Sequence, residues 1–262
     1  MKWETVSFEK QGRIVILTLN KPETLNALSF QMRDEFAEAI NQVQQDKEAR
    51  VVIIRGEGKS FCSGGDLKST FDMYDDPPAK AQQNAFNFYK GFLSLRNLEI
   101  PVIAVIHGHT IGAGLCLAMA SDMIIAGSDA KISMSFIKVG INPGMGGTYF
   151  LPRLVGTAKA MEMCLLGEAI TARQALDIGL VNHVVEPSEL MDFALDFAGR
   201  IANNPPVAAR LIKKGIYQGL NKSLDEVLTF EAFAQVTCSS TGDMKEAVTA
   251  FKEKRPPVFT GS

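Results

Sequence analysis

The chain has 262 residues, of which 46% are hydrophobic and 21% are charged, and its net charge at pH 7 is −2. Such a composition is typical of a globular protein that buries a large core. The near-neutral charge excludes the class of proteins that bind nucleic acid through clustered Lys and Arg side chains.

The cysteines and the N-terminus exclude several further features. Cys62, Cys116, Cys164 and Cys238 lie far apart and form no C-x-x-C pair, so we expect neither a metal site nor a disulfide framework. The first residues lead into an alternating segment rather than an apolar stretch, which argues against a secretory signal. No segment approaches the roughly 20 uninterrupted apolar residues of a membrane span. We therefore expect a cytoplasmic protein with no membrane partner.

The N-terminal region alternates strands with a helix. Residues 6–9 and 14–19 flank a turn-forming glycine and predict a β-hairpin. Apolar residues at helical spacing after Ser29, a good N-cap, predict an amphipathic helix over residues 30–46. The apolar run 51–54 predicts a strand that is covered on both faces. This order of strand, helix and strand predicts a right-handed crossover.

The rest of the chain continues the β/α pattern and then becomes helical. The polar, proline-bearing segment 68–79 predicts a mobile loop before a helix through Phe86, Tyr89 and Phe92. The remaining predicted elements are strands at 101–106, 123–126 and 131–134 and helices at 112–120, 158–166, 172–178, 190–202, 207–218, 224–234 and 244–254.

Asn203-Asn204-Pro205-Pro206 marks the best candidate boundary between two regions, because paired prolines end one helix and help to start another. We expect a β/α core over residues 1–203 and a C-terminal helical region over residues 204–262. This organisation places the fold in the α/β class.

Two glycine-bearing loops follow predicted buried strands, at residues 61–67 and 107–114. Small residues leave the peptide unshielded, so each loop can bring backbone N–H groups close to a ligand. The second loop also opens a helix, whose free amides and positive dipole end suit a carbonyl oxygen that becomes anionic. Two such amides aimed at one oxygen form an oxyanion hole. The alternative is that both loops are only tight strand-to-helix turns.

Nucleotide binding is a weaker interpretation of the second loop. Gly112-x-Gly114 follows a strand and starts a helix, as in a dinucleotide-binding fingerprint, but the third glycine position is Leu117. The chain contains Gly58-Lys59-Ser60, but the first glycine of the P-loop pattern G-x-x-x-x-G-K-[ST] would fall at position 53, which is Ile53.

Taken together, the ordered motifs resemble the enoyl-CoA hydratase/isomerase (crotonase) superfamily. The resemblance runs from about residue 5 to Arg255, and five motifs in the family order make it specific. The matching stretches are 20–22 with 25–28, 61–67, 108–122, 143–148 with 151–153, and 172–185 with Gly179-Leu180-Val181-Asn182.

The resemblance implies a spiral of repeated ββα units, a C-terminal helical trimerisation region, and a homo-oligomer that is a trimer or a dimer of trimers. It implies an acyl-CoA thioester substrate whose carbonyl oxygen lies between the amides of Ser63 and Ala113. Coenzyme A would enter as part of the substrate, with no permanently bound cofactor. The residues implied to hold it are Lys21, Ala27, Phe61, Ser63, Gly64, Gly65, Asp66, Leu67, Lys68 and, from a neighbouring subunit, Lys254 among the basic residues 252, 254 and 255.

The sequence departs from the family at three acid and base positions. The two glutamates of the hydratases match Cys116 and Phe136, and the aspartate of some isomerases matches Gly144. A positioned general acid or base contributes on the order of a hundredfold to ten-thousandfold to the rate. Hydration by the usual two-carboxylate route is therefore not expected.

Two other side chains are candidate acids or bases. Cys116 lies early in a predicted helix, whose dipole would lower the thiol pKa from about 8.5; the alternative is a small buried apolar residue. His109 lies four residues before Ala113 and has the side chain best suited to proton transfer near neutral pH; the alternative is a structural histidine. Asp66 and Asp122 match positions that look structural.

Three functions remain open. The first is an enoyl-CoA hydratase/isomerase-like enzyme that stabilises an enolate and uses a non-standard acid or base. The second is decarboxylation of a malonyl-type CoA ester, because the apolar Phe136 pocket favours a reaction in which loss of carbon dioxide creates the enolate. The third is a non-catalytic acyl-CoA-binding protein.

Overall fold

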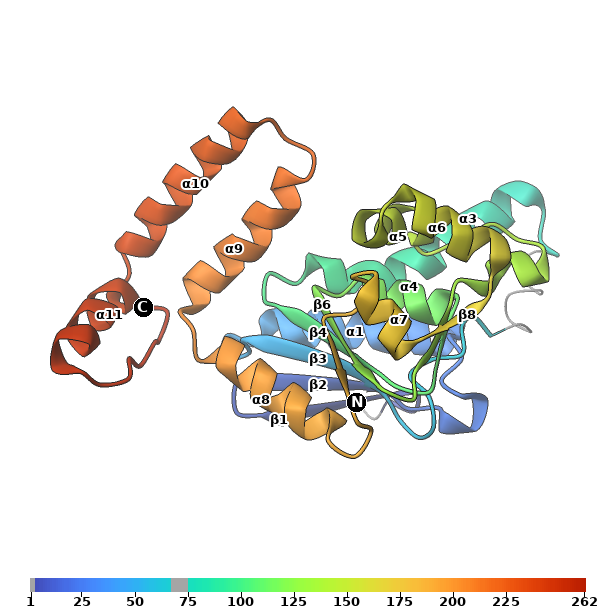
Figure 1. The fold of residues 1–262 in the computed structure, drawn as a ribbon, viewed down its shortest axis with the longest axis horizontal. Helices are drawn as coiled ribbons and strands as arrows, with labels where there is room; N and C mark the ends of the chain where they lie inside the picture. Colours follow the sequence, from blue (N-terminus) through green and yellow to red (C-terminus); the bar gives the residue numbers. More distant parts are fainter. Residues whose placement is uncertain (1–2, 67–74) are drawn as a thin grey trace.

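The computed structural model describes residues 3–66 and 75–262, and Figure 1 shows its arrangement. A six-stranded sheet forms the centre, in which β1 and β2 are antiparallel and all further neighbours are parallel. The predicted hairpin is confirmed. In spatial order the strands are β1 (Val6–Gln11), β2 (Ile14–Leu19), β3 (Val51–Gly56), β4 (Val102–Ile106), β6 (Met123–Gly127) and β9 (His183–Val185).

A second, three-stranded sheet lies beside the first. β5 (His109–Ile111) pairs in parallel with β7 (Lys131–Ser133), which pairs antiparallel with β8 (Ala169–Thr171). Together with the six-stranded sheet, this arrangement confirms the predicted α/β fold class.

The helices agree with the predicted segments, with one addition. Ser29 caps the first helix as predicted, because its side chain accepts a hydrogen bond of 3.2 Å from the Met32 N–H. The helix α5 was not predicted. The helices are α1 (Phe30–Gln45), α3 (Pro78–Phe92), α4 (Ala113–Met119), α5 (Gly147–Val155), α6 (Thr157–Leu166), α7 (Ala172–Asp177), α8 (Leu190–Ala202), α9 (Pro206–Gly219), α10 (Leu224–Ser239) and α11 (Gly242–Glu253), with 3-10 turns η1 (Pro22–Thr24), η2 (Leu93–Asn97) and η3 (Ser135–Val139).

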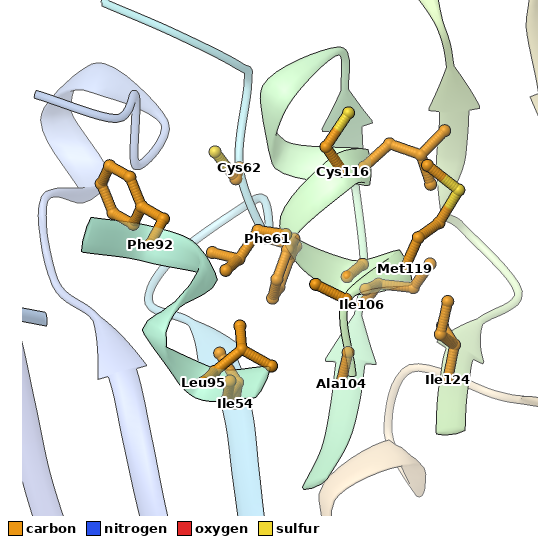
Figure 2. Packing of buried hydrophobic residues seen from close by; sticks show 14 of the residues in the cluster. Ile54, Phe61, Cys62, Phe92, Leu95, Ala104, Ile106, Cys116, Met119 and Ile124 are labelled. Atoms are coloured by element: carbon orange, nitrogen blue, oxygen red, sulfur yellow. The ribbon is translucent and has the colours of Figure 1, made fainter. Parts of the chain in front are cut away.

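The large sheet is covered on both faces. Side chains of α1, α3 and α4 form the larger apolar cluster on one face, and α8 covers the other face through Ala194 and Ala198. Figure 2 shows part of the larger cluster, which includes Phe61 and Leu95 together with Ile54 of β3. Burial on both faces explains why β3 is a continuous apolar run rather than an alternating one.

The helices α9 and α10 run side by side and extend away from the sheets (Figure 1). Neither helix has a buried residue. Among the described residues, no helix is both long enough and apolar enough to span a membrane. Large apolar side chains are exposed on this pair, namely Ile212, Ile216, Leu220, Leu224, Leu228, Phe233 and Val236.

A polar joint ties α9 to the core. The carboxylate of Asp122 accepts hydrogen bonds of 2.7 Å from the Val102 N–H and from the Tyr217 hydroxyl, and it pairs with the Lys213 ammonium at 2.7 Å. Asp122 therefore has a structural role, as the sequence analysis expected.

Candidate active site

A cavity of about 240 Å³ lies between the two glycine loops, α3 and η3. Its surface is mainly apolar, with a few hydroxyl and amide groups and exposed backbone. The described residues that line it are Ser63, Gly64, Gly65, Phe88, Tyr89, Ile111, Gly112, Ala113, Ser135, Phe136, Val139, Ile141, Asn142 and Met145.

Backbone hydrogen bonds hold the two glycine loops against each other. The Cys62 N–H donates to the His109 carbonyl and the Ile111 N–H donates to the Cys62 carbonyl, both at 3.0 Å. Gly64 has a φ of +111°, and a Cβ there would lie 3.1 Å from the Ile111 carbonyl oxygen and 4.0 Å from the Ala113 nitrogen. Glycine at position 64 therefore allows the first loop to approach the start of α4 closely.

The start of α4 presents backbone donors to the cavity. Ala113 is the first residue of the helix, and the N–H groups of a first helical turn have no partner within the helix. Gly112 precedes it with a φ of +52°, and its own N–H is used by the Ser133 carbonyl at 2.8 Å. The Ala113 amide is thus a donor at the positive end of α4, beside the cavity.

The prediction that the Ser63 amide is the second donor is wrong. The Ser63 N–H donates to the Leu25 carbonyl at 3.0 Å, which occupies it. In the residues that follow, the Gly64 carbonyl accepts from the Leu28 N–H at 2.8 Å and the Asp66 N–H donates to the Leu28 carbonyl at 3.0 Å.

Backbone groups alternate in direction along an extended segment. The C=O and the N–H of one trans peptide point in opposite directions. Because the Gly64 carbonyl faces Leu28, the Gly65 N–H is directed away from Leu28. Gly65 lines the cavity together with Ala113. Gly65, rather than Ser63, therefore supplies the candidate donor of the first loop.

The expected lowering of the Cys116 pKa is also wrong. The thiol is fully buried, donates to the Gly144 carbonyl at 3.3 Å, and does not line the cavity. Burial raises its pKa, because desolvation of the thiolate outweighs any effect of the helix dipole. Cys116 matches the alternative of a small buried apolar residue.

The structure does not place His109 in the cavity. His109 is exposed on β5, its N–H donates to the Ser60 hydroxyl at 3.2 Å, and it is not among the residues that line the cavity. Its position contradicts the tentative assignment as an acid or base and fits that of a structural residue.

Of the other two positions that matched family carboxylates, one lies at the cavity and the other lies beside a residue that lines the cavity. Phe136 on η3 lines it, and a Cβ on Gly112 would lie 3.7 Å from the Phe136 ring. A Cβ on Gly144 would lie only 2.6 Å from the Tyr89 hydroxyl. The side chain of Tyr89, which reaches the cavity from α3, therefore occupies the space that a larger residue at position 144 would need.

Sequence reasoning placed Tyr89 on a helix but did not connect it with a site. The only available signal was its position after the segment 68–79, and that gives no information about which helix face meets the glycine loops.

The residues implied to hold coenzyme A fall into three groups. Lys21 and Ala27 belong to a loop that Asn26 ties down, since its side chain accepts from the Lys21 N–H at 2.8 Å and donates to the Ser60 carbonyl at 2.8 Å. This loop also contacts the first glycine loop through Leu25 and Leu28.

Phe61 is fully buried, so only its backbone is close to the site. Leu67 and Lys68, with most of the segment predicted as a mobile loop, lie outside the described residues. Lys254 follows α11, which lies at the opposite end of the molecule from α3 (Figure 1), and α3 contributes lining residues of the cavity. Its role remains a prediction that needs a neighbouring subunit.

A second cavity, of about 560 Å³, adjoins the first and shares Ile141 and Asn142 with it. It lies between η3, α5 and α6, and its described lining has no charged side chain. The other lining residues are Ile137, Gly140, Pro143, Thr148, Pro152, Thr157, Ala160, Met161, Cys164 and Leu165.

Comparisons with known proteins agree with this fold and site. The family model described as enoyl-CoA hydratase/isomerase matches residues 9–262. The chain is 40% identical over 256 residues to a short-chain-enoyl-CoA hydratase of Clostridium acetobutylicum, covering 97% of both proteins. It is 37% identical over 252 residues to a 1,2-epoxyphenylacetyl-CoA isomerase of Escherichia coli, covering 95% of both.

A crystal structure of an enoyl-CoA hydratase from Bacillus anthracis superposes with a TM-score of 0.93 at 33% identity, covering 99% of this chain and 100% of that one. The chain therefore belongs to the enoyl-CoA hydratase/isomerase (crotonase) family. It is accordingly an acyl-CoA-processing enzyme of a family whose named members include hydratases, which are lyases, and isomerases.

Proposed function

We propose that the protein converts an acyl-CoA thioester through an enolate whose oxygen accepts hydrogen bonds from the Gly65 and Ala113 amides. The observation that carries the proposal is that both residues line one cavity while the Ser63 amide is already occupied. Donors that are fixed before the reaction need no reorganisation, and one such donor is worth roughly 2.7–4 kcal/mol.

The acid and base are not the family's usual carboxylates. No Asp or Glu is found among the described residues that line the cavity. We propose an enoyl-CoA hydratase/isomerase-like reaction with a non-standard proton donor, and no permanently bound cofactor.

A specific observation favours a second candidate, the decarboxylation of a malonyl-type CoA ester. Phe136 and its apolar neighbours make the described lining of the cavity poor in charge. A substrate carboxylate in such surroundings is weakly solvated, and loss of carbon dioxide forms the enolate without a protein base. A non-catalytic acyl-CoA-binding protein is the remaining alternative. Measurement of turnover distinguishes it from the two enzymes.

The adjoining apolar cavity is the candidate binding site for the acyl chain. Because it shares Ile141 and Asn142 with the first cavity and its described lining carries no charge, it suits a hydrocarbon chain that continues from the thioester. Each buried methylene is worth about 0.8 kcal/mol, so longer apolar acyl groups should bind more tightly until the cavity is filled.

We also propose that the protein works as a homo-oligomer, a trimer or a dimer of trimers. The exposed apolar side chains of α9 and α10 support this, since seven large apolar residues exposed on one pair of helices favour an interaction site. In such an assembly Lys254 of one subunit would meet coenzyme A bound to another.

The test compares wild-type protein with Ala113→Pro on a panel of enoyl-, hydroxyacyl- and malonyl-type CoA thioesters. Proline is tolerated at the first position of a helix but has no N–H, so the change removes one oxyanion donor. We expect kcat to fall about 10²- to 10³-fold.

Ala113→Gly is the matched control, because it changes the same position but keeps the backbone N–H that the proposal requires. Equal turnover by a folded Ala113→Pro variant and by wild type would refute the enolate site. Tight acyl-CoA binding without turnover of any thioester would favour the non-catalytic alternative.

A further inference from the structure

The described residues that line the cavity have few groups able to transfer a proton. Of the described residues that line it, only Tyr89 has a titratable side chain. The remainder are glycines, apolar residues, two serines and Asn142. A reaction through an enolate nevertheless has to deliver a proton to carbon, so the donor must be a side chain, a bound water, or both.

Packing fixes the position of Tyr89. The preceding residue, Phe88, makes edge-on contacts with Phe30 of α1 at 5.4 Å and with Phe92 at 5.2 Å between ring centroids. These contacts set the rotation of α3 about its axis. Tyr89 then points toward Gly144, where the missing side chain leaves room for the phenol hydroxyl.

Three other candidate donors either lie outside the cavity or already donate to another group. The Cys116 thiol is buried outside the cavity and donates to the Gly144 carbonyl. His109 is exposed and does not line the cavity. The hydroxyl of Ser63 donates to the Thr24 carbonyl at 3.3 Å.

A phenol suits an apolar cavity better than a carboxylic acid does. The neutral phenol donates one hydrogen bond and accepts others. It has no charge to desolvate in the resting enzyme, whereas an ionised carboxylate in the same surroundings would be costly to bury. Tyrosine is also among the side chains that enzymes use as general acids.

We propose that Tyr89 is the catalytic acid that protonates the α-carbon of the enolate. The step rests on the proposed function. The enolate double-bond electron pair forms the new C–H bond as the phenol O–H bond breaks and the thioester carbonyl is restored. The phenolate then takes a proton from water. The same step completes hydration of an enoyl thioester and decarboxylation of a malonyl-type thioester.

The main test is Tyr89→Phe, which removes the hydroxyl and keeps the ring. We expect kcat to fall about 10²- to 10⁴-fold, with KM changed by less than about threefold, since uniform binding is retained. Tyr149→Phe is the matched control, because Tyr149 is exposed on α5 and does not line the cavity.

The stereochemistry of protonation provides a readout that a merely structural role would not move. In deuterated water, wild-type enzyme should place deuterium on one face of the α-carbon. Tyr89→Phe should lose that preference, because solvent then protonates both faces. The alkaline limb of the kcat profile should also disappear, since the ionisable acid is gone.

A second variant keeps the phenol but moves it. Gly144→Ala places a methyl group where only 2.6 Å separates its carbon from the hydroxyl, so the ring must shift. We expect a loss of kcat in this variant too. If Tyr89→Phe does not fold, the kcat of Gly144→Ala tests the role of Tyr89 in its place, and an unchanged kcat would overturn that role.

Unchanged kcat and unchanged deuterium stereochemistry in folded Tyr89→Phe would overturn the role of Tyr89 and leave the proposed function intact. Failure of wild-type enzyme to convert any thioester of the panel would overturn both.

Discussion

The sheet core and the α9–α10 pair use apolar residues in opposite ways. In the core, all six residues of β2 are buried, and α4 is buried along its whole length. In the α9–α10 pair no residue is buried, although both helices carry large apolar side chains. Apolar content alone therefore does not distinguish the two regions. What differs is whether another element of the same chain covers the apolar face.

The difference shows what stabilises each region. Burial of apolar surface holds the core together. The α9–α10 pair depends on the Asp122 joint within one chain, and its apolar faces remain available to a second copy. The effects of substitutions in the two regions should consequently differ in magnitude. They should also differ in the property that changes, which is the free energy of unfolding in the core and self-association in the α9–α10 pair.

The largest effect is expected in the core. Phe61 is fully buried, and Phe61→Ala should lower the free energy of unfolding by about 3–5 kcal/mol, because it removes apolar contacts and leaves a cavity. Urea denaturation monitored by circular dichroism measures this change. A loss below about 1 kcal/mol would show that the core repacks around the missing ring.

A smaller effect is expected at the joint. Burial lowers the pKa of Lys213, and the Asp122 charge opposes that shift. Asp122→Asn should cost about 1.5–3 kcal/mol, the usual value of hydrogen bonds to a charged group, and should speed amide exchange in α9. Asp177→Asn, in an exposed pair with Arg173, is the control, with almost no expected change.

The same joint should respond to alkaline pH. Burial raises the pKa of Tyr217 from 10.0 to about 12, and Asp122 adds to the shift. The phenol is thus protonated in the folded state where it ionises in the unfolded chain. The stability that it contributes is fully present below pH 10 and is lost as the pH rises through about 12.

Tyr217→Phe should therefore cost about 0.5–1.5 kcal/mol near neutral pH, and the difference from wild type should shrink between pH 10 and 12. Denaturant titrations at a series of pH values measure it. A difference that stays constant over this range would contradict the burial of the phenol.

The smallest effect on unfolding is expected in the α9–α10 pair. Phe233 is 64% exposed, so Phe233→Ala should change the unfolding free energy of the dissociated chain by no more than about 0.5 kcal/mol. It should weaken self-association, which sedimentation measures. Glu231→Ala, a polar change on the same helix, is the control. Unaltered association of Phe233→Ala would remove this face from the proposed interface.

Long elements could be predicted from the sequence because periodicity needs length. The helix α1 has an N-cap and four turns of apolar spacing, and the structure confirms it. The strands β5, β8 and β9 were not predicted, because each has only three residues, which are too few to show alternation. The helix α5 begins in a glycine-rich segment and contains Pro152, both of which normally oppose a helix.

The site was predictable as two loops but not as individual donors. Which amide remains available depends on Leu25 and Leu28, which contribute their backbone from a separate part of the chain. The prediction of a lowered Cys116 pKa failed because the position of a residue in a helix indicates the effect of the helix dipole but not how deeply the side chain is buried. Tyr89 was missed because its relation to Gly144 exists only after α3 packs on α1. The boundary between residues 203 and 204 remains a prediction.

The contact between Tyr89 and position 144 restricts how this enzyme can diverge. An aspartate at residue 144 and the present placement of the Tyr89 ring exclude each other, because even a single added carbon would collide with the hydroxyl. A mutational route to an acidic side chain at position 144 therefore has to move the Tyr89 ring or replace it. Under the proposed role of Tyr89, the first step of such a route displaces the proton donor before an acidic side chain can be positioned to replace it.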